Sequence, residues 1–253
     1  MTGDLYLKAI LTREAVDTSL LSPAFLARAT LTPVINAWGG RYVQSVTPSG
    51  SFAKGTANKS GTDVDLFISL RPSTPDSLKQ IYLTLFNALT DAGYVVRKQD
   101  VSLGIRVAQI DVDLVPGKQQ TALTTDYSLY RSRADTWTKT NVQTHIDVVR
   151  AAGMQPETRI IKLWRDQNRL DFPSVYLELV VIRALQLNFS VSLAERVLVV
   201  LRFLANSFVA ARVTDPDNAN NAISDDLTFA DKLAIERAAQ VALAQETWGS
   251  IVQ

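Results

Sequence analysis

The chain has 253 residues, with 26 basic and 25 acidic side chains, a formal net charge of +1, no cysteine and one histidine. Without cysteine, disulfides, zinc–thiolate sites, iron–sulfur clusters and thiol nucleophiles are excluded, and one histidine excludes a multi-histidine metal site. A protein-bound metal would therefore be held by oxygen ligands, which favours a hard cation such as Mg²⁺. The near-neutral charge argues against a strongly basic nucleic-acid-binding body but allows a local basic patch.

The composition and hydropathy pattern predict a globular protein without a membrane partner. Apolar residues make up 47% of the chain, which is enough for a sizeable core. The first ten residues lack the apolar stretch of a secretion signal, and the most apolar stretch, 197–205, is short and interrupted by Arg202. We therefore expect a cytoplasmic protein with no membrane span.

The first half of the chain is predicted to combine helices and strands. Helical spacing of apolar residues continues to Gly39-Gly40, and an alternating pattern over 41–48 predicts a strand. A polar, glycine-bearing stretch over 49–62 separates this strand from a second one over 63–70. A helix then opens at Thr74-Pro75-Asp76 and ends at Gly93.

Short strands are predicted next, and helices after them. The strands are expected over 94–97, 102–108 and 109–116, and the pattern turns helical from about Gln119. Helices are expected over 144–152, 157–167, 175–187, 194–211 and 228–252. The predicted fold class is α+β, with a mixed sheet and flanking helices in residues 1–130, a helical lobe in 131–253, and a ligand cleft between the two.

Two pairs of aspartates on predicted strands are the main candidates for chemistry. Asp63 and Asp65, and likewise Asp111 and Asp113, are two residues apart, so each pair projects from one face of its strand. Adjacent carboxylates repel one another unless a divalent cation lies between them. If the two strands are neighbours, their carboxylates meet as a two-metal phosphoryl-transfer site requires. The alternative is that these acids are solvated on the exposed faces of amphipathic strands.

A glycine-bearing loop precedes the first acidic pair. Gly50 allows the backbone to approach an anion closely, Ser51 offers a hydroxyl donor, and Lys54 adds positive charge. Alone, this loop would be interpreted as an ordinary turn between strands. Its position just before the two acidic pairs favours phosphate binding.

These residues resemble the signature of the DNA polymerase β-like nucleotidyltransferases, in which Gly50-Ser51 would be followed by the acidic strand 63–66. Residues 113–116 resemble the third-acid strand of oligoadenylate synthetases, cyclic GMP–AMP synthases and archaeal-type CCA-adding enzymes. The resemblance implies that Asp63, Asp65 and Asp113 are the catalytic and metal-binding residues, with Mg²⁺ or alternatively Mn²⁺ as cofactor. Asp111 would be a neighbour on the same face with no assigned role.

The resemblance extends into the predicted helical lobe. Residues 159–164 are similar to the helix whose lysine contacts the triphosphate in these families, which implies this role for Lys162. Residues 173–179 are similar to the start of the next helix, where a serine binds phosphate and an aromatic ring stacks on the base. The corresponding residues are Ser174 and Tyr176, and they complete the nucleotide-binding set with Gly50 and Ser51.

Each of these helical-lobe residues also has an ordinary structural interpretation: a solvated helix lysine for Lys162, a helix cap for Ser174 and a core ring for Tyr176. His145 lies where archaeal-type CCA-adding enzymes have a triphosphate-contacting histidine, and it is otherwise a structural histidine. Asp215 begins an Asp-Pro turn similar to one in the same families, and we expect it to hold that turn through its own backbone.

The predicted activity is transfer of a nucleoside monophosphate from an NTP, most simply ATP, to a hydroxyl, with pyrophosphate leaving. One acceptor is a second bound nucleotide, as in bacterial cyclic or linear oligonucleotide second-messenger synthases, which implies a role in antiviral defence. Another is an RNA or tRNA 3′ end, as in CCA-adding enzymes or tRNA-modifying toxins, for which Arg131, Arg133, Lys139 and Arg150 offer a local basic patch. A third possibility is a catalytically silent nucleotide-binding protein.

Overall fold

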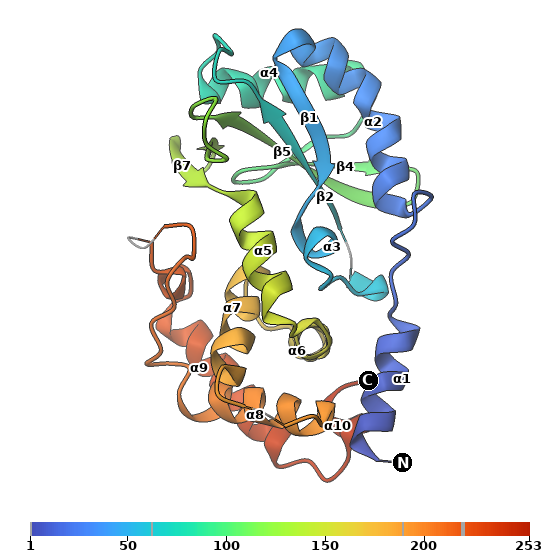
Figure 1. The fold of residues 1–253 in the computed structure, drawn as a ribbon, viewed down its shortest axis with the longest axis vertical. Helices are drawn as coiled ribbons and strands as arrows, with labels where there is room; N and C mark the ends of the chain where they lie inside the picture. Colours follow the sequence, from blue (N-terminus) through green and yellow to red (C-terminus); the bar gives the residue numbers. More distant parts are fainter. Residues whose placement is uncertain (1, 62, 189, 219–220) are drawn as a thin grey trace. The chain divides into compact units, whose positions relative to one another are not determined.

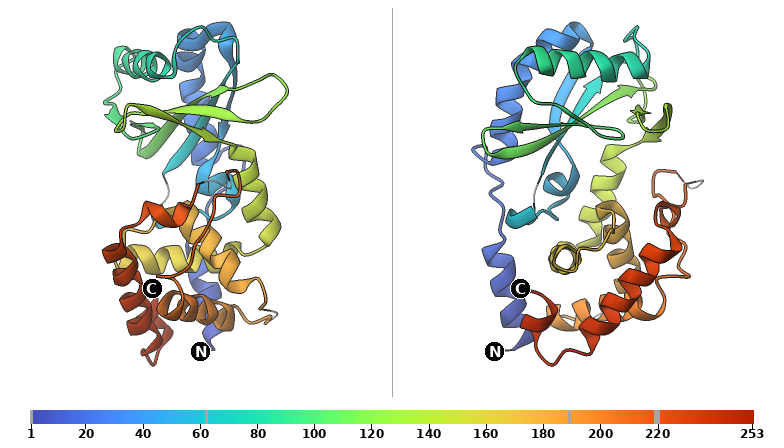
Figure 2. Two further views of the ribbon diagram at one scale, coloured as in Figure 1. Left: turned by 90° about the vertical axis from the view of Figure 1, so that its left-hand side faces the viewer. Right: turned by 180° about the vertical axis from the view of Figure 1, so that it is seen from behind.

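A computed structural model describes residues 2–61, 63–188, 190–218 and 221–253 (Figures 1 and 2). The chain divides into two compact units, and it passes from one unit to the other four times. The sheet unit contains residues 17–54 and 61–146, and the helical unit contains residues 1–16, 55–60 and 147–253. The division predicted at 130/131 thus lies at 146/147, and the N-terminal helix belongs to the helical unit rather than to the sheet unit.

In the described residues, the sheet unit contains one seven-stranded mixed sheet (Figure 1). The strands lie in the order β1-β2-β5-β4-β3, β6 pairs with β5, and β7 pairs with β6. The β2–β5 pair is parallel and the other pairs are antiparallel. The strand bounds are β1 Val43–Pro48, β2 Val64–Leu70, β3 Arg97–Lys98, β4 Leu103–Val107, β5 Ile110–Gln119, β6 Tyr127–Arg131 and β7 Thr136–Thr140.

Helices α2 (Pro23–Gly39) and α4 (Leu78–Asp91) pack on one face of this sheet (Figure 1). Alternate residues of the central strands supply the apolar contacts, as Val64, Leu66 and Ile68 do on β2. Helix α4 begins at Leu78, after the predicted opening at Thr74-Pro75-Asp76, because Ser77 forms its capping box. The remaining elements that begin in this unit are η1 Gly40–Tyr42, α3 Gly50–Lys54 and α5 Val142–Ala152, and the last boundary falls within α5. The short η2 Lys59–Gly61 begins in the helical unit and ends in the sheet unit.

The β6–β7 hairpin differs from the sequence-based prediction of helix after Gln119. Its two strands pair in register from Tyr127 opposite Thr140 to Arg131 opposite Thr136. The segment is rich in aromatic and β-branched residues, which fit a pleated surface, and Tyr127 packs edge-on against Phe67 of β2 with ring centroids 4.8 Å apart. Contact with the existing sheet therefore decides the local structure.

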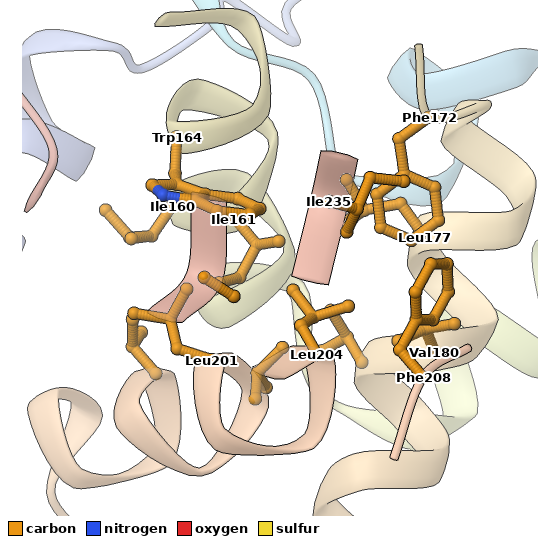
Figure 3. Packing of buried hydrophobic residues seen from close by; sticks show 14 of the residues in the cluster. Ile160, Ile161, Trp164, Phe172, Leu177, Val180, Leu201, Leu204, Phe208 and Ile235 are labelled. Atoms are coloured by element: carbon orange, nitrogen blue, oxygen red, sulfur yellow. The ribbon is translucent and has the colours of Figure 1, made fainter. Parts of the chain in front are cut away.

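The helical unit is built from α1 Gly3–Arg13, α6 Gln155–Gln167, α7 Ser174–Leu185, α8 Leu193–Asn206, η3 Ile223–Asp226, α9 Phe229–Leu243 and α10 Trp248–Ile251. The helix predicted over 228–252 is thus divided into α9 and α10. The core of the helical unit contains apolar side chains from α1 and from the segment that runs from α6 to the C-terminus (Figure 3). Trp164 of α6, Phe208 after α8 and Ile235 of α9 are among its fully buried members, and α8 packs along α9 (Figure 2). In the part of the chain that is described, no helix is long and apolar enough to cross a membrane.

Candidate active site

The register of the parallel strands brings the two acidic strands together. Asp65 of β2 lies opposite Asp113 of β5. Their strand neighbours Val64, Leu66 and Val112 belong to the core under the helices, so both aspartates face away from α2 and α4. The two predicted strands are thus neighbours, and Asp65 and Asp113 lie side by side on one face of the sheet, both half-buried.

Mutual repulsion marks this group of acids. Partial desolvation, followed by the charge of Asp111, raises the pKa of Asp63, which directly precedes β2. Burial, followed by the charge of Asp63, raises the pKa of Asp113, while Gln99 and Arg97 act in the opposite direction. Asp111 differs, because Arg97 Nη2 lies 3.1 Å from its Oδ1 in an ion pair. Negative charge therefore accumulates on this face with Arg97 as a partial counter-charge.

The residues present fit a hard divalent cation by their chemistry. In the described ranges, no group of three histidine, cysteine, aspartate or glutamate side chains is gathered closely enough to hold a metal ion. The donors on this face are carboxylate oxygens, the ligands that Mg²⁺ prefers, and a cation would relieve the repulsion between Asp63 and Asp113. Asp63, Asp65 and Asp113 are thus neighbours that are not assembled into a coordination shell.

Gly50 fits against the acidic strand in a way that no other residue can. Its φ of +54° is left-handed, and a Cβ at this position would lie 1.7 Å from Asp65 Oδ2. The backbone N–H of Ser49 also donates to the carbonyl of Asp65 at 2.8 Å. Ser51 follows in the short helix α3, which the sequence pattern did not predict, and its side chain is half-buried. The predicted phosphate-binding loop is therefore seated directly on the β2 aspartate.

Gln99 belongs to this site although no sequence pattern indicates it. Its Nε2 donates to Asp113 Oδ1 at 2.9 Å, and Ser102 Oγ donates to Gln99 Oε1 at 2.7 Å. Gln99 lies in the connection between β3 and β4, where no local motif indicates a contact with an aspartate 14 residues later. This contact depends on the pairing of β4 with β5.

Lys162 lies in a buried ion pair, which is neither the triphosphate contact nor the solvated position expected from the sequence. Its side chain is 6% exposed, and its Nζ lies 2.7 Å from Oε1 of the fully buried Glu178. Thr56 Oγ1 donates to the same Glu178 oxygen at 2.7 Å and accepts from Lys162 Nζ at 3.0 Å. The solvated interpretation is therefore wrong. The predicted triphosphate contact stays a prediction, which the ion pair with Glu178 inside the helical unit does not support.

Tyr176 lies in the core of the helical unit. Its side chain is fully buried, and its ring packs against Phe172 and Phe208, each with ring centroids 5.3 Å away. Burial raises the pKa of Tyr176 to about 12, and its hydroxyl has no hydrogen-bond partner among the described residues. The core interpretation is confirmed, and the base-stacking prediction is corrected because no ring face is exposed to a base.

The other predicted residues occupy varied positions. Ser174 is the first residue of α7 rather than its cap, and its Oγ accepts from Arg165 Nη1 at 3.0 Å. His145 is half-buried in the first turns of α5, in the sheet unit. The carboxylate of Asp215 accepts from the backbone N–H of Asp217 at 2.9 Å, which confirms its predicted role in the turn. Phosphate binding by Ser174 and His145 stays a prediction.

Comparison with solved structures identifies the fold. CdnC of Escherichia coli MS115-1, solved with ATP, has a TM-score of 0.76 and 20% identity over 97% of this chain and 94% of CdnC. CdnG, a Bradyrhizobium diazoefficiens CD-NTase in complex with GTP, has a TM-score of 0.75 and 16% identity over 94% and 89%. The Elizabethkingia meningoseptica CdnE cyclic dinucleotide synthase, solved with GTP and Apcpp, has a TM-score of 0.73 and 14% identity over 97% and 100%.

The sequence comparison covers the sheet unit from residue 34 onward, together with residues 55–60 and 147–169 of the helical unit. No curated protein sequence matches the chain. Residues 34–169, more than half of the chain, match the family described as nucleotidyltransferase domain, and they include the loop at Gly50 and all four aspartates of the acidic face. The chain therefore belongs to the nucleotidyltransferase domain family and is a nucleotidyltransferase enzyme.

Proposed function

We propose that this nucleotidyltransferase joins nucleotides to one another, transferring a nucleoside monophosphate from an NTP to the hydroxyl of a second bound nucleotide and releasing pyrophosphate. The product would be a cyclic or linear oligonucleotide. The single observation that carries the proposal is the placement of Asp65 opposite Asp113, with Gly50 seated against Asp65. The fold shared with the CdnE cyclic dinucleotide synthase supports the choice of acceptor.

In the proposed reaction, the acceptor oxygen forms a bond to the α-phosphorus while the bond from that phosphorus to the pyrophosphate oxygen breaks. Asp63, Asp65 and Asp113 would hold Mg²⁺ or Mn²⁺, which when bound lowers the pKa of the attacking hydroxyl and neutralises charge on the triphosphate. Asp113 accepts the hydroxyl proton. The backbone amide region of Gly50 and the hydroxyl of Ser51 donate to phosphate oxygens.

Lys162 and Tyr176 are left out of the proposed nucleotide site. The ion pair with Glu178 and the aromatic packing around Tyr176 give both residues structural roles in the helical unit. Ser174 and His145 remain proposed phosphate contacts. Ser174 Oγ accepts from Arg165 Nη1 at 3.0 Å, so its own proton would be offered to a phosphate oxygen.

The RNA-end alternative has less support, because two members of the basic patch are neutralised. Arg131 Nε lies 3.1 Å from an oxygen of Asp100, and Lys139 Nζ lies 2.9 Å from an oxygen of Asp126. Neutralised cations release few counterions on binding RNA, so they contribute little affinity. The near-neutral net charge of +1 agrees with a nucleotide rather than a polynucleotide acceptor.

The decisive experiment identifies the products that the purified protein forms from an equimolar mixture of four NTPs and Mg²⁺, with and without tRNA, by mass spectrometry. The proposal expects phosphatase-resistant oligonucleotides in the absence of RNA. Addition of nucleotides to tRNA alone would favour the RNA-end alternative, and NTP binding without turnover would favour the silent one. Asp113→Asn serves as the inactive control, and Asp126→Asn, which removes a carboxylate of a half-buried ion pair in the same unit, as the active one.

A further inference from the structure

We propose that Gln99 is a positioning residue for nucleotidyl transfer, and that it fixes the carboxylate of Asp113 through an amide whose orientation Ser102 sets. The proposal rests on the proposed function, because it takes Asp113 as the carboxylate that accepts the hydroxyl proton. The contacts that carry it are the 2.9 Å hydrogen bond from Gln99 Nε2 to Asp113 Oδ1 and the 2.7 Å hydrogen bond from Ser102 Oγ to Gln99 Oε1.

The chemistry of these groups allows only one direction for the hydrogen bonds. An ionised carboxylate can only accept, so the NH₂ end of the Gln99 amide must face Asp113. The carbonyl end then faces Ser102, and the Ser102 hydroxyl must be the donor. Rotation of the amide by 180° would place its carbonyl against the carboxylate and break the hydrogen bond to Asp113, so one oxygen of Asp113 is held in place while the other stays available.

The backbone around this amide is fixed from the core of the sheet unit. The N–H of Gln99 donates to the carbonyl of Ser102 at 3.0 Å. The hydroxyl of Tyr82, a residue only 1% exposed, donates to the carbonyls of Gln99 at 2.8 Å and of Ser102 at 3.1 Å. A buried side chain on α4 thus anchors both ends of the connection that carries Gln99, so the amide is ordered before any ligand binds.

Gly104 leaves the space that this contact needs. It lies opposite Asp113 in the β4–β5 register. A Cβ on Gly104 would stand 2.9 Å from Gln99 Nε2 and 3.0 Å from Asp113 Oδ1, which is closer than Cβ atoms normally approach either atom. The strand position beside the aspartate is therefore open only because it is glycine, and the Gln99 amide passes over it.

The two aspartates of β5 are treated differently by their neighbours. Asp111 is paired with the cation of Arg97, whereas Asp113 meets the neutral amide of Gln99. A cation at this position would neutralise the carboxylate, while an amide orients it and leaves its charge for the reaction. This difference assigns Asp113 to chemistry and gives Asp111 the role of holding Arg97.

Gln99→Met tests the proposal, because methionine keeps the unbranched shape and removes both hydrogen bonds. We expect kcat for pyrophosphate release to fall about 10- to 100-fold, with the KM for NTP within about twofold of the wild-type value. Mn²⁺ binding to the nucleotide-free protein, measured by calorimetry, should weaken as well. Ser102→Ala should lower kcat by a smaller factor, since the amide remains but loses its orientation.

Ser132→Ala is the matched control, because Ser132 Oγ donates to the main-chain carbonyl of Gln99 at 2.6 Å and does not touch the amide. It should lower the melting temperature without changing kcat or Mn²⁺ affinity. Wild-type kcat and Mn²⁺ affinity in Gln99→Met would overturn the proposal, as would an equal loss of kcat in Ser132→Ala. If Asp113→Asn itself keeps wild-type turnover, the failure lies with the proposed function instead.

Discussion

Replacement of Lys162 by methionine should destabilise the protein strongly. Lys162 Nζ and Glu178 Oε1 are 2.7 Å apart, with side chains 6% and 1% exposed, so the substitution removes a cation from a buried carboxylate. Removing one partner of a buried ion pair typically costs about 3–5 kcal/mol in the free energy of unfolding. The hydrogen bond from Thr56 Oγ1 to Glu178 remains and compensates in part, so we expect the lower end, about 3 kcal/mol.

The double variant Lys162→Met with Glu178→Leu separates two effects. One is the unfolding free energy lost when the buried ion pair is broken, and the other is any role of Lys162 in nucleotide binding. Replacing a whole buried ion pair by apolar side chains of similar size is often neutral or stabilising, so the double variant should lie within about 1 kcal/mol of the wild type. Urea unfolding followed by far-UV circular dichroism measures both free energies, and the KM for NTP is then measured on the double variant.

Two results would contradict this structural interpretation of Lys162. The first is a single Lys162→Met variant with wild-type unfolding free energy, because a buried carboxylate cannot lose its cation without cost. The second is a stable double variant whose KM for NTP rises tenfold or more, because that loss would restore the triphosphate contact implied by the sequence resemblance. Wild-type KM in the stable double variant is the expected result.

Three further predictions concern Gly50, Asp113 and Tyr176. Gly50→Ala should lower the free energy of unfolding by about 1–2 kcal/mol because of the left-handed backbone alone, which thermal melting measures. It should also abolish turnover, measured as pyrophosphate release, because the new Cβ overlaps the carboxylate of Asp65. Asp113→Asn should reduce kcat at least about 100-fold. The melting temperature without metal should stay the same or rise, because a neutral amide ends the repulsion from Asp63, and a marked fall in melting temperature would count against this. Tyr176→Phe should leave the KM for NTP unchanged and the unfolding free energy at pH 7 equal or higher. Because the folded pKa of Tyr176 is about 12, the wild type should lose stability from about pH 10 upward, as its unfolded state releases the phenolic proton first, and Tyr176→Phe should lose less; urea unfolding at pH 7 and pH 11 tests this.

The sequence predicted the parts of the site that depend on local pattern. The i, i+2 spacing of Asp63 with Asp65, and of Asp111 with Asp113, implies one face of a strand, and the structure places Asp65 opposite Asp113 on adjacent strands. Gly50 was identified for its freedom to approach an anion, and in the structure its close neighbour is Asp65. The spacing and type of neighbouring residues therefore predicted which residues lie on the acidic face.

The parts that the sequence did not predict depend on contacts between distant segments. Lys162 and Glu178 meet because α6 and α7 pack together and Thr56 joins them, and nothing in either helix alone distinguishes a buried lysine from a solvated one. Tyr176 likewise contacts the nearby Phe172, which precedes α7, but Phe208 from a distant segment completes the packing around its ring. Gln99 reaches Asp113 only once β4 has paired with β5.

The interleaved composition of the units has a consequence for synthesis on the ribosome. Helix α1 is made before the residues on which it packs, because its buried side chains Leu7 and Ile10 lie in a core otherwise supplied by residues from Ile160 to Val252. All residues of the sheet unit, 17–54 and 61–146, are translated before those partners exist. At about 5–20 residues per second, the apolar stripe of α1 must wait on the order of ten seconds or more, a window in which chaperone binding would protect the nascent chain.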